Sequence, residues 1–244
     1  MVRGFYALGS GMLTQNRVLG AISNNIANID TNGYKKSTVT TSTFGAMVVN
    51  RVDAQKTALG GVTMSNIMNT NTTIHSEGTL KSTDRALDFA ISGQGFYGVQ
   101  SNSGTVYTRN GSFNLDDQGY LCVKDVGRVL GQNGPIYLGT DAITVDGQGN
   151  ITAGGKVAGK LAVYDFANYD NLSKVGEGTY SGTNATLTAN PQIMWKTLEG
   201  SNVDTAEEMT NAIAAQRNLQ NCSQALKMYD TVLAKAVTDI GKVV

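Results

Sequence analysis

Hydrophobic positions near the start of the chain recur with helical spacing. They alternate steps of three and four residues and include one polar member, Gln15. Such a heptad pattern predicts a long helix that packs one face against another helix. We expect it to run from about Arg3 to Ile29, because Asn32-Gly33 favours the left-handed geometry that ends helices. The stripe consists of Phe5, Leu8, Met12, Gln15, Leu19, Ile22, Ile26 and Ile29.

A second stripe with the same spacing lies near the end of the chain. Thr205, followed by Glu208, has the pattern of a capping box, which predicts a helix start. Polar residues interrupt this stripe, which favours a helix packed in a larger assembly over a tight two-stranded coiled coil. The stripe consists of Met209, Ala212, Gln216, Leu219, Ser223, Leu226, Asp230, Leu233, Val237 and Ile240.

The middle of the chain has a different pattern. Residues 38–80 are rich in Thr, Ser and Asn with weak alternation, which predicts extended segments and loops. From about 86 to 195, short apolar runs alternate with turn pairs such as Asn110-Gly111 and Asn133-Gly134. This pattern predicts an antiparallel all-β domain, a barrel or a sandwich.

The expected fold class is therefore α+β. Two long terminal helices should pair as a coiled-coil-like helical domain, with the antiparallel β domain between them in sequence. The expected boundaries are an N-terminal helix over 1–33, an extended connector over 34–85, the β domain over 86–198 and a C-terminal helix over 199–244.

Composition narrows the function classes. Nineteen basic residues balance 19 acidic ones, so no net field favours nucleic acid or an anionic membrane. Cys122 and Cys222 lie far apart and are expected to be free thiols. The N-terminus lacks an unbroken apolar signal segment, and no run approaches the roughly 20 apolar residues of a membrane span. We expect a soluble protein that does not use an ordinary signal peptide if it is exported.

The string Gly93-Gln-Gly95-Phe96-Tyr-Gly98 matches the dinucleotide-binding pattern G-x-G-x-x-G. A dinucleotide site needs a helix directly after the glycines, and the sequence that follows predicts turns and a strand. We therefore interpret the glycines as a bend between two short strands, and keep a nucleotide-binding enzyme as the weaker alternative. Four apolar residues of these strands should help to build the β core: Phe89, Ile91, Phe96 and Val99.

No other catalytic or ligand-binding pattern is evident. His75 lies in a polar loop, and we expect a surface side chain. Asp116 and Asp117 are expected to be turn residues, while Lys35 and Arg109 are scattered bases that do not form a nucleic-acid patch. The sequence predicts no catalytic residue, no cofactor and no metal site.

The two helical stripes suggest self-assembly. A helix with an apolar stripe cannot bury it alone, and the outer faces of a two-helix pair would still be moderately apolar. Repeated identical contacts that do not close give a helical filament. We therefore expect a polymer subunit whose helices form the contacts and whose β domain lies outside. A monomer with a helical hairpin beside a β domain is the alternative.

Four segments resemble the motifs of bacterial flagellar axial proteins. Residues 23–35 (SNNIANIDTNGYK) resemble an "ANNLAN-x-x-T-x-GYK" signature, and residues 87–99 resemble "DVAI-x-G-x-GFF-x-V". Residues 107–121 are similar to "YTRxGxFxxDxxGxL", and residues 198–209 with Gln216-Arg217 are similar to "SNVD…EM…QR". The residues that match are Asn24, Asn25, Asn28, Thr31, Gly33, Tyr34, Gly93, Gly95, Phe96, Tyr107, Thr108, Arg109, Gly111, Ser201, Asn202, Val203, Asp204, Gln216 and Arg217.

This resemblance implies a structural subunit of the flagellar basal-body rod, the drive shaft that carries torque from motor to hook. The length resembles that of rod proteins, of proximal or distal type, although a short hook-type protein is an alternative. The implied partners are copies of the chain, other rod and hook proteins and the flagellar type III export apparatus, with no nucleic acid and no small-molecule substrate. The implied location is the basal body, in the cell envelope after export from the cytoplasm.

Overall fold

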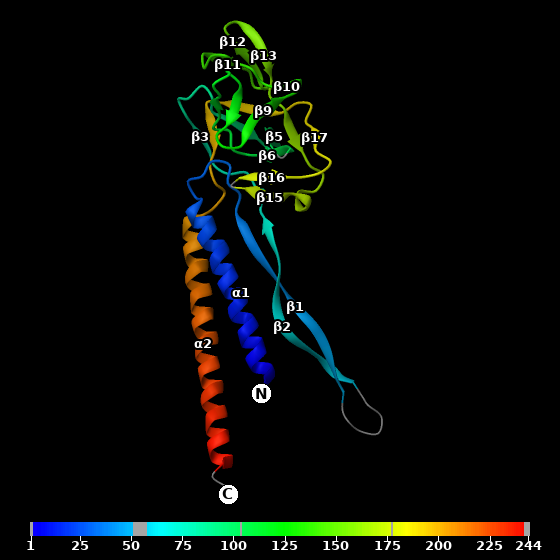
Figure 1. Ribbon diagram of the computed structural model, residues 1–244, viewed down its shortest axis with the longest axis vertical. Helices are drawn as coiled ribbons and strands as arrows, with labels where there is room; N and C mark the ends of the chain where they lie inside the picture. The colour runs from blue at the N-terminus through cyan, green and yellow to red at the C-terminus, as the bar shows by residue number, and fades with distance from the viewer. Residues whose placement is uncertain (1, 51–57, 103, 177, 242–244) are drawn as a thin grey trace. The chain divides into compact units, whose positions relative to one another are not determined.

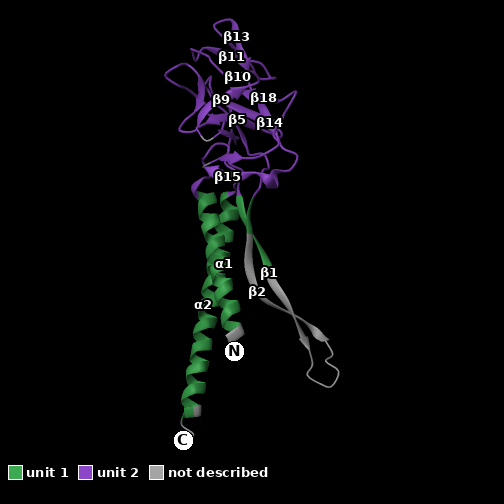
Figure 2. Cartoon of the chain, turned by 45° about the vertical axis from the view of Figure 1, so that its right-hand side comes forward, with its two compact units in different colours: residues 1–26, 37–72, 205–244 green, residues 27–36, 73–204 purple. Residues whose placement is uncertain are grey.

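The computed structural model describes residues 2–50, 58–102, 104–176 and 178–241 (Figure 1). These residues form two compact units, each assembled from separate stretches of the chain (Figure 2). Unit 1 comprises residues 1–26, 37–72 and 205–244, and unit 2 comprises residues 27–36 and 73–204.

Two long helices and one two-stranded sheet make up unit 1. Helix α1 spans Val2–Ala27, and helix α2 spans Thr205–Gly241 with Glu207 and Glu208 in its first turn. The two helices lie side by side in both views (Figures 1 and 2). Strands β1 (Ser37–Asn50) and β2 (Ala58–Thr73) pair only with each other among the described strands. The connector expected at 34–85 therefore contains two long strands.

Unit 2 is built from short antiparallel strands, which confirms the expected α+β class. Its main sheet has the order β15-β16-β6-β5-β9-β8-β7, with β10 added to β9, and with β14 pairing with both β5 and β17. Smaller sheets are formed by β11-β12-β13, by β18-β4 and by β19-β3.

The bounds of these elements are β3 Leu80–Ser82, β4 Phe89–Ser92, β5 Phe96–Ser101, β6 Gly104–Thr108, β7 Asn114–Leu115, β8 Leu121–Val123, β9 Gly127–Gly131, β10 Gly134–Pro135, β11 Ile143–Val145, β12 Asn150–Ala153, β13 Lys156–Lys160, β14 Val163–Asp165, the 3-10 helix η1 Tyr169–Asn171, β15 Ser173–Gly176, β16 Thr179–Ser181, β17 Thr186–Leu187, β18 Gln192–Trp195 and β19 Thr197–Glu199.

The core of unit 2 has two parts. The larger cluster contains Phe89, Ile91 and Val99, as alternation predicted, together with side chains from most of the other strands. Phe96 is equally buried, but it belongs to a separate aromatic cluster with Tyr107, Phe166 and Tyr180. All four predicted core residues are therefore confirmed as buried, but they serve two clusters.

The glycine string forms the turn between β4 and β5, and no helix follows it. Gly93 and Gly95 have φ values of 96° and 117°, in the region where glycine is favoured. A Cβ atom on Gly95 would lie 2.5 Å from Val163 Cγ1. The structural interpretation of these glycines is confirmed.

Candidate functional site: a buried ionic cluster and a helical seam

Four segments that are distant in sequence meet at the Glu199 carboxylate in unit 2. Lys35 Nζ donates to Glu199 Oε1 at 2.5 Å, and Arg109 Nη1 donates to Oε2 at 3.0 Å. The backbone N–H of Gly78 also donates to Oε1, and that of Gly33 donates to the Glu199 carbonyl oxygen. The Lys35, Arg109 and Glu199 side chains are almost wholly buried. We call these three residues the ionic cluster.

Burial dominates the electrostatics of this cluster. It lowers the pKa of Lys35, because desolvation disfavours the charged amine, while the Glu199 carboxylate opposes that shift. Two cations share one carboxylate, so loss of Glu199 would leave two buried positive charges without a counter-ion. Glu199 therefore holds the cluster together.

Arg109 connects the ionic cluster to the glycine string. Its Nη2 donates to the Gly93 carbonyl oxygen at 2.5 Å, and Nη1 also reaches the Ile91 carbonyl oxygen at 3.4 Å. The guanidinium lies over the Phe96 ring, 5.5 Å from its centroid. The sequence indicated Arg109 only as a scattered base, whereas the structure encloses its cationic group among segments that only the tertiary fold brings together.

Asn202 ties the segments around the cluster through its side-chain amide. Its Oδ1 accepts from the Lys36 backbone N–H at 2.7 Å, and its Nδ2 donates to the carbonyl oxygens of Ile74 and Ser76. Its backbone N–H donates to the Tyr34 carbonyl oxygen. One amide therefore joins the segments before β1, after β2 and before α2.

His75 lies against this region rather than at the surface, so the sequence expectation was wrong. Burial lowers its pKa to about 4, with smaller effects from the positive charges of Lys35 and Arg109. Its Nδ1 atom is buried and has no hydrogen-bond partner in the structure. The centroid of the imidazole ring lies 5.2–5.6 Å from the ring centroids of three aromatic side chains, those of Phe96, Tyr169 and Tyr180.

The remaining motif residues shape turns and packing around these groups. Asn28 accepts at Oδ1 from the Thr31 hydroxyl, and Gly33 has a φ of 71°. Thr108 Oγ1 donates to the Gly178 carbonyl oxygen. A Cβ on Gly111 would lie 1.7 Å from the Phe89 carbonyl oxygen, so a side chain is excluded there.

The helices of unit 1 are antiparallel and share one register. A Cβ atom on Gly4 would lie 2.6 Å from Tyr229 Oη, and one on Gly11 would lie 3.8 Å from Cys222 Sγ. From the first contact to the second, the position moves seven residues toward the C-terminus in α1 and seven residues toward the N-terminus in α2. Asn25, fourteen residues beyond Gly11, donates from Nδ2 to Glu208 Oε2, fourteen residues before Cys222.

This register defines the helical seam by alternating steps of four and three residues. Ile22, Asn25, Glu208 and Ala215 are its most buried members. Asn25 also bonds to both backbone groups of Ser37, which anchors the start of β1 to the end of α1. The helical seam comprises Gly4, Leu8, Gly11, Gln15, Val18, Ile22 and Asn25 on α1, and Glu208, Ala212, Ala215, Leu219, Cys222, Leu226 and Tyr229 on α2.

Most of the helical positions that the sequence indicated fall on or beside this seam. Leu8, Gln15, Ile22, Ala212, Leu219 and Leu226 belong to it, and Met12, Leu19 and Ile26 are partly buried. Ile29 is not helical, because α1 ends at Ala27 and Ile29 lies in the turn that follows. Phe5, Met209, Gln216, Arg217, Leu233 and Val237 are exposed in the single chain, and the side chain of Ile240 lies outside the described residues.

Sequence reasoning missed the glycines and Cys222 at the seam, and it missed Glu199 as the centre of the ionic cluster. Glycines seven residues apart, at Gly4 and Gly11, were an available signal for a close helix contact. No local signal identifies Glu199, because its two cationic partners lie 164 and 90 residues away.

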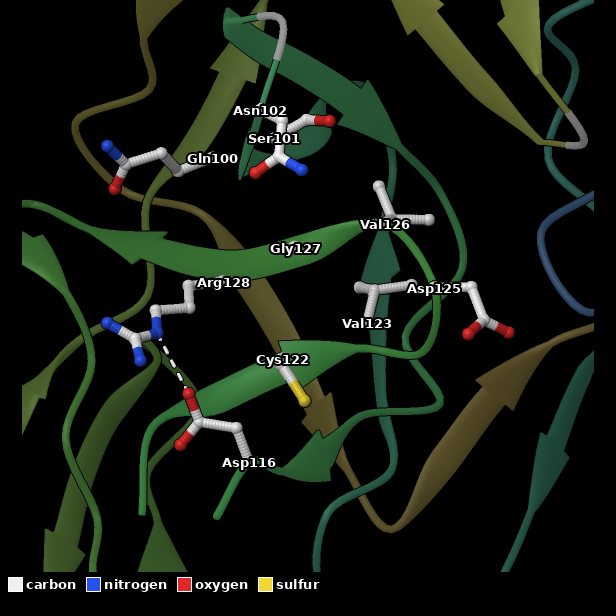
Figure 3. Close-up of a pocket in the computed structure, with 10 residues that line it drawn as sticks. All are labelled: Gln100, Ser101, Asn102, Asp116, Cys122, Val123, Asp125, Val126, Gly127 and Arg128. Atoms are coloured by element: carbon white, nitrogen blue, oxygen red, sulfur yellow. Dashed lines mark hydrogen bonds and ion pairs between the residues drawn. The ribbon is translucent and has the colours of Figure 1, made fainter. Parts of the chain in front are cut away.

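A hollow of about 600 Å³ lies beside strands β5, β8 and β9 (Figure 3). Asp116 accepts from Arg128 Nε at 2.8 Å and from two backbone N–H groups, which confirms its role as a turn residue. Burial raises the pKa of Cys122, so the thiol stays protonated at neutral pH. Among the residues drawn in Figure 3, the one interaction marked is that of Asp116 with Arg128.

Within residues 2–50, 58–102, 104–176 and 178–241, no group of three or more His, Cys, Asp and Glu side chains could hold a metal ion. Neither described helix has a stretch long and apolar enough to cross a membrane.

Three protein-family models match the chain. The flagella basal body rod protein model matches residues 5–35, and the flagellar hook protein FlgE/F/G D1 domain model matches residues 90–153. The flagellar basal body rod FlgEFG protein C-terminal model matches residues 196–239. The matched regions include α1, the glycine string with Arg109, and α2 with Glu199.

Full-length relatives agree with the family models. The chain is 36% identical to the flagellar basal-body rod protein FlgG of Bacillus subtilis, over 97% of this chain and 98% of that protein. It is 33% identical to FlgG of Agrobacterium fabrum, over 94% and 96% of the two chains, and 28% identical to the rod protein FlgF of Caulobacter vibrioides over the whole of both. With the family models and the full-length relatives in agreement, this chain belongs to the flagellar basal-body rod proteins, a family of structural, non-enzymatic proteins.

Proposed function

We propose that this chain is a subunit of the flagellar basal-body rod that polymerises helically, with copies of itself and with other rod and hook proteins, into a torque-transmitting shaft. The observation that carries this proposal is the apolar surface left on the helices after they pair. The large apolar side chains of α1 and α2 that are exposed in the single chain include Phe5, Tyr6, Leu13, Met209, Ile213, Met228, Val232 and Val237. Large exposed apolar patches indicate protein–protein contacts.

The structure of unit 2 fits a subunit that carries mechanical load. Glu199 and Asn202, which precede α2, bond directly to residues 33–36, which follow α1. Torque applied to one of these segments would pass to the other through buried, charge-assisted hydrogen bonds, which are stronger than neutral ones. No catalytic step is part of this proposal.

Export and partners follow from the same proposal. We expect the chain to leave the cytoplasm through the flagellar type III export apparatus and to take its place in the rod within the cell envelope. Neither nucleic acid nor a small-molecule substrate takes part.

Replacement of one exposed helical residue tests the assembly proposal. Ile213 is 54% exposed, so Ile213→Asp should leave the isolated chain folded while removing an apolar contact from the assembly. We expect the variant to give wild-type circular dichroism but few rods when it replaces the native gene in a flagellated cell.

The matched control is Asn221→Asp, which adds the same charge at another exposed position of α2 without removing an apolar side chain. Rods and motility should persist in this control. Normal rods with Ile213→Asp would contradict a role for this surface in assembly.

A further inference from the structure

Tyr137 holds an aromatic ring at the surface of unit 2. Its side chain is 56% exposed, whereas its neighbours Ile136 and Leu138 are buried. The Leu121 N–H donates to the Ile136 carbonyl oxygen, and the Leu138 N–H donates to the Gly119 carbonyl oxygen. Backbone hydrogen bonds on both sides of Tyr137 therefore fix the position from which its ring projects.

Two glycines make room for this ring. A Cβ atom on Gly119 would lie 3.1 Å from Tyr137 Cε2, and one on Gly139 would lie 3.2 Å from Tyr137 Oη. Both distances are shorter than an ordinary van der Waals contact between such atoms. The absence of these side chains lets the Tyr137 ring lie close to the backbone, while more than half of the residue remains exposed.

Tyr120 and Arg128 extend the surface around this ring. Tyr120 forms an antiparallel bridge with Tyr137, and their ring centroids lie 5.3 Å apart with an interplanar angle of 72°. On Tyr120, the guanidinium carbon of Arg128 lies over the ring, 4.1 Å from its centroid. We call Tyr120, Tyr137 and Arg128 the aromatic platform.

Arg128 gives the platform hydrogen-bond donors in a fixed orientation. Its Nε donates to Asp116 Oδ2 at 2.8 Å, and its Nη2 donates to Gln118 Oε1 at 2.6 Å. A guanidinium carries five N–H donors, and Nη1 makes no hydrogen bond within the part of the chain that the structure describes. Because the Arg128 side chain is 37% exposed, these remaining donors are open to a ligand.

Arg128 also connects the platform to the hollow beside β5, β8 and β9 (Figure 3). The volume of this hollow, about 600 Å³, falls within the range of about 300–1,000 Å³ that is typical of ligand sites. Its lining includes the amide groups of Gln100 and Asn102 and the carboxylate of Asp125. An exposed ring and a polar hollow thus adjoin the same guanidinium.

We propose that the aromatic platform and the adjoining hollow bind a glycan of β-1,4-linked amino sugars, a proposal that rests on the rod-subunit function above. A rod subunit in the bacterial cell envelope meets such a polymer in the cell wall. These sugars carry their substituents around the rim of the ring and expose C–H bonds on its faces. The C–H bonds can pack on the electron-rich face of the Tyr137 ring, while the rim reaches the donors of Arg128.

The surroundings of the platform favour a sugar over a protein partner. The turn that leads to Tyr120 contains Asp116 and Asp117, whereas the centre of a protein interface is depleted of such charged residues. Carboxylates accept hydrogen bonds and a guanidinium donates them, so the hydroxyl and amide groups of a sugar would find both kinds of partner here.

Titration of the full-length monomer with chitohexaose, a soluble β-1,4-linked oligomer of N-acetylglucosamine, tests this site. In ¹H–¹⁵N NMR spectra we expect saturable shifts of the Gly119, Gly139 and Arg128 amides, and no such shifts with the α-linked maltohexaose. Tyr137→Ala should weaken binding about tenfold or more, since an aromatic anchor is lost, whereas Tyr137→Phe keeps the ring and should bind like the wild type. The matched control is Tyr6→Ala, which removes a tyrosine that is 70% exposed in unit 1 and should leave binding unchanged.

The outcomes separate this inference from the rod-subunit proposal. Chitohexaose that causes no saturable shift at the platform, or that binds Tyr137→Ala as well as the wild type, would overturn the glycan site. If Tyr137→Ala instead prevented polymer formation and no glycan bound, the platform would be a contact between subunits, and only the rod-subunit proposal would stand. A wild-type chain that binds chitohexaose but stays monomeric at every concentration would overturn the rod-subunit proposal alone.

Discussion

The ionic cluster places three charged residues in the interior of unit 2, where most proteins place none. Its stability depends on complete pairing, because a buried charge without a partner costs far more than an exposed one. Lys35 and Glu199 are fully buried, and Arg109 is nearly so. Single residues therefore determine how residues 33–36 are held against residues 199–202.

Neutralising Glu199 should destabilise unit 2 strongly. Glu199→Gln leaves Lys35 and Arg109 buried without a counter-ion, and we expect a loss of about 3–5 kcal/mol in the free energy of unfolding. Trp195, the single tryptophan, lies in unit 2 and reports urea unfolding by fluorescence.

The surface pair Asp116–Arg128 provides the control for that experiment. Its side chains are 24% and 37% exposed, so solvent screens the pair and Asp116→Asn should cost clearly less than Glu199→Gln. If the two variants lost the same free energy of unfolding, the buried cluster would contribute no more to stability than the surface pair, which would contradict this prediction.

The single histidine should make stability depend on pH. The pKa of His75 is about 4 in the folded chain, below the ordinary value of 6.5, so folding favours the neutral imidazole. Its contribution is complete above about pH 6.5 and is lost as the pH falls from 6.5 toward 4. His75→Phe keeps an aromatic ring against its neighbours but cannot be protonated. The melting temperature of this variant should therefore change less between pH 6.5 and pH 5 than that of the wild type. A histidine resonance that titrates near 6.5 in the folded protein would refute this.

At the scale of elements, glycines decide how closely helices and strands approach. In the turn between β4 and β5, Gly95 needs both a positive φ and an absent side chain, whereas Gly93 needs only the positive φ. In the helical seam, the missing side chain of Gly4 leaves room for the Tyr229 ring of α2. The same residue type therefore serves a strand turn and a helix contact.

Substitution in the β4–β5 turn separates the two requirements. Gly95→Val would bring a branched side chain against Val163 and should destabilise unit 2 by about 3 kcal/mol or more. Gly93→Ala meets no atom within 4 Å and should cost only the backbone strain, about 1 kcal/mol. Chemical denaturation measures both, and equal effects would count against the close contact at Gly95.

The helical seam can be tested apart from unit 2. Ile22 is 7% exposed, and Ile22→Asp places a charge in the seam, so the helical signal in circular dichroism should fall while Trp195 fluorescence stays native. Gln216→Asp on the exposed side of α2 serves as the control and should leave helicity unchanged. Full helicity in Ile22→Asp would contradict the register described here.

At the scale of the whole molecule, two units of different character share one chain. Unit 2 has two buried apolar clusters and a buried ionic cluster, whereas the helices of unit 1 bury one seam and leave apolar side chains exposed. Local stability follows buried contacts, so the helices should open more readily than the strands in an isolated chain. Assembly would then stabilise unit 1 more than unit 2.

Limited proteolysis of the dilute monomer should show this difference. We expect early cuts within α1 and α2 and a protected fragment that retains the strands of unit 2, identified by mass spectrometry. In the assembled form the helices should become protected. Helices as resistant as unit 2 in the monomer would contradict the proposal that assembly completes their packing.

The sequence by itself determined the class of fold and the family, because both depend on local patterns. Heptad steps predicted both terminal helices, although the expected bounds of 1–33 and 199–244 each extend six residues beyond the end of the helix next to the β domain. Turn pairs predicted the antiparallel strands, and the strand expected after Gly98 is present. On α2 the sequence predicted a stripe through Met209 and Gln216, whereas the buried seam runs beside it through Glu208 and Ala215. The apolar pattern of a helix does not by itself show which apolar residues are buried within the chain and which remain exposed.

Only the tertiary structure decided which charges are buried and which faces are covered. In the sequence, Lys35 and Arg109 are scattered bases and His75 is expected to be a surface side chain, because hydropathy describes a residue and not its neighbours in space. Lys35 and Arg109 are both paired with Glu199, which lies 164 residues from Lys35 and 90 from Arg109. Pairing energy between residues so far apart is a property of the folded chain, and no local pattern encodes it.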